Sequence, residues 1–352
     1  MTSPASNTTP VAQRTSAKLL SVCIPAYNRA KYLPETLESL LPQLAGDVEL
    51  LVYDTGSTDG TPELMRGYQD RFPNLRLFLL DERRGFDEAL LLLLAEARGD
   101  YVWYFGSDDV LDPGAVDEIR RAILRCRERP SFIFLNHSVV DHGGRLLIPS
   151  NAGRVGNQEF RTGRECVARL GLHLGYISAC IFRREYAQPL TATDRFLGSL
   201  WMGLHLNLLA LAKPGPALYL GRAMVRARRN PGNIYDYGEI FCRRASEVFW
   251  HARGRGIGWS SVYRAMNLTV RLFHFRYAVS RRCEDPAELD RALPAMLRAC
   301  WAYPWFWILI VPVRLIPSRL ARAARDSLQQ RRAQQNARAG LRGRAPVARE
   351  QG

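Results

Sequence analysis

Short apolar runs alternate with helical stretches over the first 136 residues, and this alternation constrains the fold more than any other feature of the chain. The apolar runs lie at 19–25, 48–53, 75–80, 101–105 and 132–136. Apolar residues recur at helical spacing over 33–44, 61–71, 87–98 and from 114 to about 128. Strands that alternate with helices form βαβ units, whose parallel sheet needs helices on both faces. The pattern therefore predicts an α/β fold with a mostly parallel sheet and flanking helices.

The rest of the chain divides by composition. Residues 1–18 are rich in Ser, Thr, Pro and Ala and lack the apolar run of a signal peptide, so they predict a disordered start. We expect the α/β domain to span 19–220, with 170–220 mostly helical, and a helical region to follow over 221–300 after a basic loop at 222–233. The aromatic segment 301–317 is shorter than the roughly 20 residues of a spanning helix and predicts an interfacial segment at a membrane. Residues 318–352 are rich in Arg and predict a solvated basic arm.

The formal charge of +15 indicates an anionic partner. A nucleotide diphosphate, an acidic membrane surface and a nucleic acid all satisfy that charge. The basic residues concentrate after Pro317 and in short loops, without a nucleic-acid-binding module, so we expect no nucleic-acid partner. The seven cysteines form no CxxC pair and no Cys/His cluster at zinc spacing, which favours reduced thiols in the cytoplasm over disulfides or a zinc site.

Three polar loops follow predicted strands, at the edge where a parallel sheet binds its ligands. They read PAYNR at 25–29, DTGSTDG at 54–60 and GSDD at 106–109. A carboxylate at a strand end can accept hydrogen bonds from a base or a ribose, and glycine lets the backbone approach a ligand. Asp108 and Asp109 can hold a hard divalent ion through oxygen. Taken singly, each loop is equally well explained as a turn or a helix cap. Their order on successive strands favours a site.

In that order the three segments resemble the nucleotide-binding domain of glycosyltransferase family 2. The resemblance covers about residues 20–136 and rests on SVCIPAYNRAKYLPETLESLL, ELLVYDTGSTDGT and YVWYFGSDDVLDPGAV. It implies the GT-A fold, a Rossmann-like, mostly parallel sheet with flanking helices. It also implies an inverting transfer of a sugar from a nucleotide diphosphate sugar to a hydroxyl, with Mn²⁺ or Mg²⁺ across the diphosphate.

The resemblance carries site residues over to this chain. For the nucleotide it implies Pro25, Tyr27, Asn28, Arg29, Asp54, Ser57, Asp87 and Ser107. For the metal it implies Asp108 as the principal ligand, with Asp109 beside it. The chain departs from the family pattern where Gly106 replaces the first Asp of the acidic motif, and where RRGFDEALL lacks the usual Arg and Asn after the glycine. The GFD segment and the Gly-containing motif resemble the abequosyltransferase-like branch, which builds surface polysaccharide such as O-antigen.

An inverting transfer needs a base for the proton of the acceptor hydroxyl. In the family, an Asp downstream of the metal motif has this role. Asp194 is the only Asp between 163 and 220 and is our first candidate, although it precedes a predicted helix, where capping is the alternative. His205 is the second candidate, with a core histidine as its alternative, because it lies at helical spacing among apolar residues. That neither is catalytic also stays open.

The acceptor that we expect is a glycan, lipid-linked, at the inner face of the cell membrane. The aromatic segment and the basic tail would then hold a peripheral enzyme at an anionic membrane surface. Gly106 also suggests an inactive sugar-nucleotide-binding protein, and the net charge suggests a nucleic-acid-binding protein as the weaker alternative. Nucleotidyl transfer would need a Gly-rich basic loop after the first strand, which PAYNRAKY does not provide.

Overall fold

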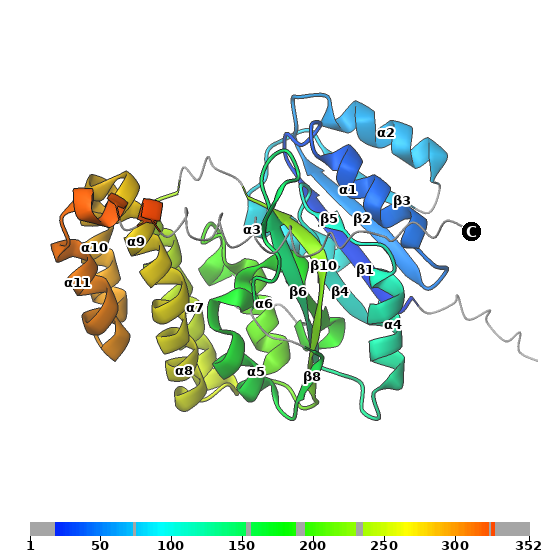
Figure 1. The fold of residues 1–352 in the computed structure, drawn as a ribbon. Coiled ribbons are helices and arrows are strands. Elements are labelled where there is room, and N and C mark those ends of the chain that lie inside the picture. Colours follow the sequence, from blue (N-terminus) through cyan, green and yellow to red (C-terminus); the bar gives the residue numbers. More distant parts are fainter. Residues whose placement is uncertain are drawn as a thin grey trace, which may run out of the picture. The chain divides into compact units, whose positions relative to one another are not determined.

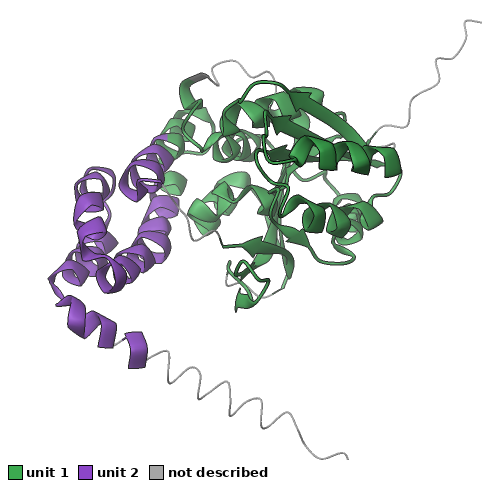
Figure 2. Ribbon diagram, turned by 90° about the horizontal axis from the view of Figure 1, so that it is seen from above, with its two compact units in different colours: residues 1–233, 248–262 green, residues 234–247, 263–352 purple. Residues whose placement is uncertain are grey.

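The computed structural model describes residues 18–72, 75–152, 156–187, 194–229, 235–323 and 325–327. The chain divides into two compact units (Figure 2). The first comprises residues 1–233 and 248–262, and the second comprises 234–247 and 263–352. The predicted disordered start, up to residue 17, and the tail from 328 lie outside the described residues.

One ten-stranded sheet organises the first unit (Figure 1). Its strands are β1 (Leu20–Ala26), β2 (Val48–Thr55), β3 (Leu75–Leu80), β4 (Tyr101–Tyr104), β5 (Val110–Leu111), β6 (Phe132–Val140), β7 (Leu146–Ile148), β8 (Gln158–Phe160), β9 (Cys180–Arg183) and β10 (Ala217–Arg228). The order is β3-β2-β1-β4-β9-β6-β10-β5, with β7 beside β6 and β8 beside β10. Strands β3, β2, β1 and β4 are parallel. Because β9 is antiparallel to both β4 and β6, and β10 is parallel to β6, strands β6 and β10 run in the direction of β1 and β9 runs opposite to it.

Helices follow the strands as the sequence predicts. They are α1 (Leu33–Leu40), α2 (Thr61–Arg71), α3 (Phe86–Glu96), α4 (Ala115–Arg125), α5 (Gly163–Leu170), α6 (Met202–Leu211), α7 (Ala245–Ala252), α8 (Trp259–Thr269), α9 (Phe275–Glu284), α10 (Pro286–Cys300) and α11 (Val311–Leu315). Short 3-10 helices lie at Leu41–Gln43, Gly171–Gly175, Ile177–Ala179, Arg184–Ala187, Asp194–Phe196 and Arg253–Arg255. The α/β class, with a mostly parallel sheet and a helical region after it, is confirmed.

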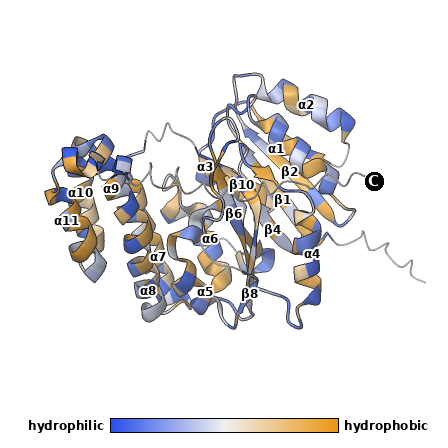
Figure 3. Cartoon of the chain, viewed as in Figure 1, coloured by the Kyte–Doolittle hydropathy of each residue, from blue (hydrophilic) through white to orange (hydrophobic). Residues whose placement is uncertain are grey.

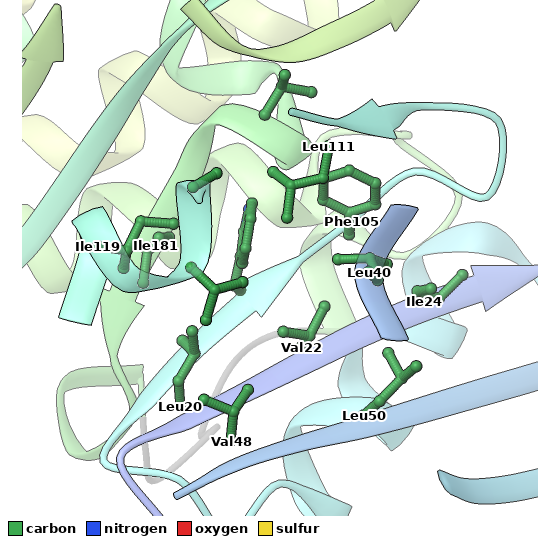
Figure 4. Close-up of a cluster of buried hydrophobic side chains, with 14 of the residues drawn as sticks. Leu20, Val22, Ile24, Leu40, Val48, Leu50, Phe105, Leu111, Ile119 and Ile181 are labelled. Atoms are coloured by element: carbon green, nitrogen blue, oxygen red, sulfur yellow. The ribbon is translucent and has the colours of Figure 1, made fainter. Parts of the chain in front are cut away.

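The core on one face of the sheet follows from the two-residue period of the strands. Leu20, Val22 and Ile24 of β1 point to the same face and pack with Leu50 of β2 and Ile119 of α4 (Figure 4). Helix α1 adds three side chains at a spacing of four and three residues, Leu33, Leu37 and Leu40. Helices α3 and α6 contact other strands and each other. Hydrophobic and hydrophilic stripes on α2 and α4 in Figure 3 are typical of helices with one buried side.

One sequence prediction about organisation is wrong. Residues 222–228, expected in a basic loop, continue strand β10, and the expected domain boundary after Leu220 falls inside that strand. The segment 170–220, expected to be mostly helical, contains α6 and four short 3-10 helices, and it also contributes β9 and the start of β10 to the sheet. β10 stays extended because it pairs with β6 on one side and β5 on the other. The arginines of β10 made this segment look like a loop in the sequence, although its Val225 and Ala227 are buried.

The second unit is helical. Turns of π-helix lie at Gly238–Arg244, Val270–His274 and Phe306–Ile310. Tyr237 and Tyr277 stack in its interior with ring centroids 3.5 Å apart. The Asp285 side chain caps α10 by accepting a hydrogen bond from the Glu288 N–H. Among the described residues, no helix has both the length and the apolar character that crossing a membrane requires.

Candidate active site

The candidate site lies at the carboxyl edge of the sheet, where β1, β2, β4 and β10 end together because they run in one direction. The loop 27–32 follows β1, the loop 56–60 follows β2 and the loop 105–109 follows β4. These are the three polar loops of the sequence. The predicted Pro25 is buried inside β1, opposite Tyr53 of β2.

Hydrogen bonds join the first two loops. The Asn28 N–H donates to Ser57 Oγ at 2.7 Å, and Asn28 Oδ1 accepts from the Thr58 N–H at 2.9 Å. The Arg29 N–H donates to Thr61 Oγ1 at 2.9 Å. Asn28 has a φ of 53°, a left-handed conformation that Asn tolerates better than most residues. Asn28 and Ser57 therefore shape this edge, and their contact with a nucleotide stays a prediction.

Asp54 forms a turn at the end of β2. It is buried, and its carboxylate accepts hydrogen bonds from the Ser57 N–H at 3.0 Å and from Ser57 Oγ at 2.5 Å. An Asp that bonds to the backbone a few residues ahead is a common turn former. The loop 54–60 therefore forms the turn that was the alternative explanation of its sequence. A nucleotide contact of Asp54 remains a prediction.

Tyr27 and Arg83 form a cation–π contact at the same edge. The Arg83 guanidinium lies 4.5 Å from the centroid of the Tyr27 ring. Arg83 comes from the segment between β3 and α3, in which the sequence predicted no site residue. The paired arginines before Gly85 were the available signal. A half-buried ring beside a cation can receive a base by stacking.

Asp109 faces the protein interior. It is buried and accepts hydrogen bonds from Tyr176 Oη at 2.6 Å, Ser178 Oγ at 2.5 Å and the Arg228 N–H at 3.0 Å. Burial, followed by the charge of Asp108, raises the pKa of Asp109 to about 6. Three donors from the protein engage both oxygens. Asp109 therefore stabilises the loop 105–109, which we name the acidic loop. This leaves Asp108 as the metal-ligand candidate.

Asp108 is half-buried and sits at the turn between β4 and β5. Among the described residues, no hydrogen bond or ion pair engages its carboxylate. Mg²⁺ and Mn²⁺ are commonly held by one or two carboxylates together with substrate phosphates, so one available carboxylate at this edge fits such an ion. The described part of the chain holds no cluster of three or more His, Cys, Asp or Glu residues placed for a metal.

Arg228, at the end of β10, ties the acidic loop to its surroundings. Its Nε donates to the backbone oxygen of Asp108 at 3.1 Å, and its Nη1 donates to that of His142 at 2.7 Å. Its Nη2 makes an ion pair of 2.5 Å with Glu35 of α1. The Arg228 side chain is 5% exposed but that of Glu35 is 53% exposed, so solvent still screens the pair. Arg29 adds a second tie, from Nε to Ser107 Oγ at 3.2 Å.

Gly106 departs from the family motif for a reason of packing. A Cβ at this position would lie 2.6 Å from Asp109 Oδ2 and 3.2 Å from Ser178 Oγ. The Gly106 N–H also donates to Ser178 Oγ at 2.8 Å. The interior bonds of Asp109 therefore occupy the space that a side chain at position 106 would need.

We predict that restoring the family's aspartate will harm the protein. Gly106→Ala should lower the free energy of unfolding by about 1–3 kcal/mol, as overpacking does, and Gly106→Asp by more, since it brings a third carboxylate beside Asp109. Urea unfolding measures both. Gly67→Ala is the matched control, because a Cβ there meets nothing within 4 Å inside α2. If Gly106→Ala unfolds like the wild type, the loop is looser than the contacts indicate.

The hydrogen bonds of Asp87 connect it to the start of α6 and not to the three loops. It is buried in the first turn of α3 and accepts hydrogen bonds from the N–H groups of Leu200 at 2.8 Å and Met202 at 3.1 Å. Burial raises its pKa. The bonds place the carboxylate at the start of α6, where free N–H groups and the helix dipole favour an anion. Both carboxylate oxygens of Asp87 already accept hydrogen bonds, and its contact with a nucleotide stays a prediction.

The two candidate bases come from the segment before α6 and from α6 itself. Asp194 begins the 3-10 helix Asp194–Phe196, but its side chain lies outside the described part of the structure. His205 is buried on α6, with ring centroids 4.7 Å from Phe196 and 5.6 Å from His251. Burial, followed by the positive charge of His251, lowers the pKa of His205 to about 4. An imidazole with this pKa is a weak base at neutral pH.

Solved structures of the same architecture define the class of fold. The chain is similar to S. aureus TarS 1–349 in complex with UDP-GlcNAc, with a TM-score of 0.57 and 16% identity over 88% of this chain and 92% of that chain. It is also similar to the mannosyltransferase PcManGT from Pyrobaculum calidifontis in complex with GDP-Man and Mn²⁺, with a TM-score of 0.50 and 20% identity over 88% and 84% of the chains. The chain has the GT-A glycosyltransferase fold, as predicted.

The family model described as Glycosyl transferase family 2 matches residues 21–187, just under half of the chain. Over these residues the chain is similar to glycosyltransferases of that family. A chondroitin synthase of Escherichia coli is 33% identical over 134 residues, which are 37% of this chain and 18% of the relative. The abequosyltransferase RfbV of Salmonella typhimurium is 40% identical over 100 residues, 26% of this chain and 29% of the relative. The chain thus spans less than a third of the length of either relative.

Proposed function

We propose that this chain transfers a sugar, with inversion, from a nucleotide diphosphate sugar to a glycan hydroxyl in the synthesis of surface polysaccharide or O-antigen. The observation that carries the proposal is the joined set of loops at the carboxyl edge, with the Asp108 carboxylate available beside them. The TarS and PcManGT structures, which hold UDP-GlcNAc and GDP-Man, support a nucleotide sugar as donor. The likeness to an abequosyltransferase supports an O-antigen branch, with a lipid-linked glycan as acceptor.

The residues divide the work by chemistry. Tyr27, with Arg83 over its ring, would stack on the base, and Asp54 would accept hydrogen bonds from base or ribose. Asp108 would hold Mn²⁺ or Mg²⁺, which when bound neutralises the charge of the diphosphate leaving group. The cofactor is supported by the Mn²⁺ in the PcManGT complex. Arg228 would hold the backbone of the acidic loop in place.

An active enzyme is favoured over an inactive binding protein. The main argument for inactivity was the glycine at position 106, and the contact of its position with Asp109 accounts for that glycine by packing. The candidate ligand Asp108 is retained. For the base we keep Asp194 as the first candidate, because the buried, weakly basic His205 suits proton removal poorly.

A panel of nucleotide diphosphate sugars with Mn²⁺ tests the proposal. We expect one donor class to raise the melting temperature of the purified chain, because a ligand at 100 times its Kd adds about 2.7 kcal/mol of stability. The same donor should release nucleoside diphosphate when a glycan acceptor is added. Binding without release under all acceptors would favour the inactive protein. Stabilisation by polyanions alone would favour a nucleic-acid partner.

A further inference from the structure

The helical segment 306–315 of the second unit carries apolar side chains on its exposed side as well as on its buried side, with Arg314 as its one charged residue. Phe306, Ile310 and Val313 are buried within the unit. Trp307, Ile308 and Leu315 are 52%, 58% and 73% exposed. A helix that is hydrophobic all round is normally covered all round. Here, within the part of the chain that the structure describes, the second side has no cover.

The uncovered side extends to the end of α10. The indole Nε1 of Trp307 donates to the backbone oxygen of Trp301 at 2.8 Å, so the two residues are neighbours, and Trp301 is 64% exposed. Helix α11 is largely orange in the hydropathy colouring of Figure 3. We name Trp301, Trp307, Ile308 and Leu315 the apolar face. Two tryptophans on one small surface exceed the scattered apolar residues that a soluble surface normally shows.

Arginines outnumber acidic residues near this face. From 291 to 323 the chain contains five arginines and no acidic residue. Arg298, Arg319 and Arg322 are exposed, and Arg314 pairs with Asp290 at 2.8 Å, with both side chains about half exposed. Tryptophan is enriched at the boundary between hydrocarbon and water, and arginine pairs with lipid phosphate. A second copy of the chain would bring the same arginines together, which charge complementarity disfavours.

We propose that the apolar face and its arginines form a peripheral binding surface for an anionic lipid bilayer. Trp301, Trp307, Ile308 and Leu315 would enter the headgroup and upper acyl region, while the arginines contact anionic headgroups. The surface consists only of residues of the second unit. The proposal therefore goes beyond sugar transfer and stands whether or not the first unit transfers a sugar.

Cosedimentation of the full chain with vesicles tests the surface. We expect binding to phosphatidylcholine vesicles that contain phosphatidylglycerol, weaker binding to pure phosphatidylcholine, and loss of binding as salt is raised. The double variant Trp307→Ser/Ile308→Ser should lower the partition coefficient at least about tenfold, because each side chain loses its buried apolar area. Arg298→Gln/Arg319→Gln should lower it about tenfold or more on the anionic vesicles only.

Matched controls make the outcomes decisive. Trp259→Ser and Leu124→Ser remove exposed apolar side chains from the first unit and should leave vesicle binding unchanged. All the replaced residues are exposed, so circular dichroism and donor binding should match the wild type. Equal binding by the Trp307→Ser/Ile308→Ser variant would overturn the proposal. So would self-association of the wild type in light scattering that this variant abolishes without any effect on vesicle binding, since the face would then cover a second copy.

Discussion

Replacing Asp108 with Asn is expected to lower metal-dependent sugar transfer by about 10³-fold, since a divalent ion stabilises the leaving group's charge by several kcal/mol and each 1.36 kcal/mol is worth tenfold. The change removes the only carboxylate of the acidic loop that is not engaged by protein donors among the described residues. Asn keeps the size of the side chain but lacks the charge. Calorimetric titration of Mn²⁺ with the nucleoside diphosphate should show the loss of affinity directly.

The control for this variant is Asp117→Asn on α4, which removes an exposed carboxylate from the same domain and should leave transfer unchanged. Urea unfolding of Asp108→Asn should also match the wild type, because no hydrogen bond of the described residues depends on that carboxylate. If Asp108→Asn retains metal affinity, the ion is held elsewhere. If it unfolds early, its role is structural.

Asp194→Asn is expected to lower transfer by about 10² to 10⁴-fold while donor affinity is kept, which is the effect of removing a general base. The variant preserves shape and removes the group that takes the acceptor's proton. Single-turnover transfer and calorimetry with the donor separate these two quantities. The prediction rests on our proposed assignment of the base.

His205→Ala is the comparison that distinguishes a base from a core residue. The ring packs against Phe196 and His251, so its removal should cost about 2 kcal/mol of stability. Transfer by the protein that remains folded should stay near normal. Near-normal turnover in Asp194→Asn would remove our first candidate. A large loss of transfer in His205→Ala, with stability intact, would move the role to the histidine.

Local patterns in the sequence were enough for strands β1, β2, β3, β4 and β6 and for the loops at the edge of the sheet. Apolar runs at 19–25, 48–53 and 75–80 predicted β1, β2 and β3 almost to the residue, because strand and helix periodicity are properties of neighbouring residues. Parallel strands end at one edge, so the order of the loops also predicted which of them lie together. Strand β10 was missed because Arg222, Arg226 and Arg228 interrupt its apolar pattern, and only its pairing with β6, about 85 positions away, keeps it extended.

The sequence by itself thus determined the α/β class, the GT-A resemblance and the edge that carries the site. Only the tertiary structure decided which of two adjacent aspartates turns inward, because Tyr176, Ser178 and Arg228 reach Asp109 from distant parts of the chain. The same contacts account for Gly106, since the bonded Asp109 carboxylate fills the space of a side chain there. Burial is a property of the assembled fold, and it alone separates the buried Phe306 and Ile310 from the exposed Trp307 and Leu315 in one mostly apolar segment.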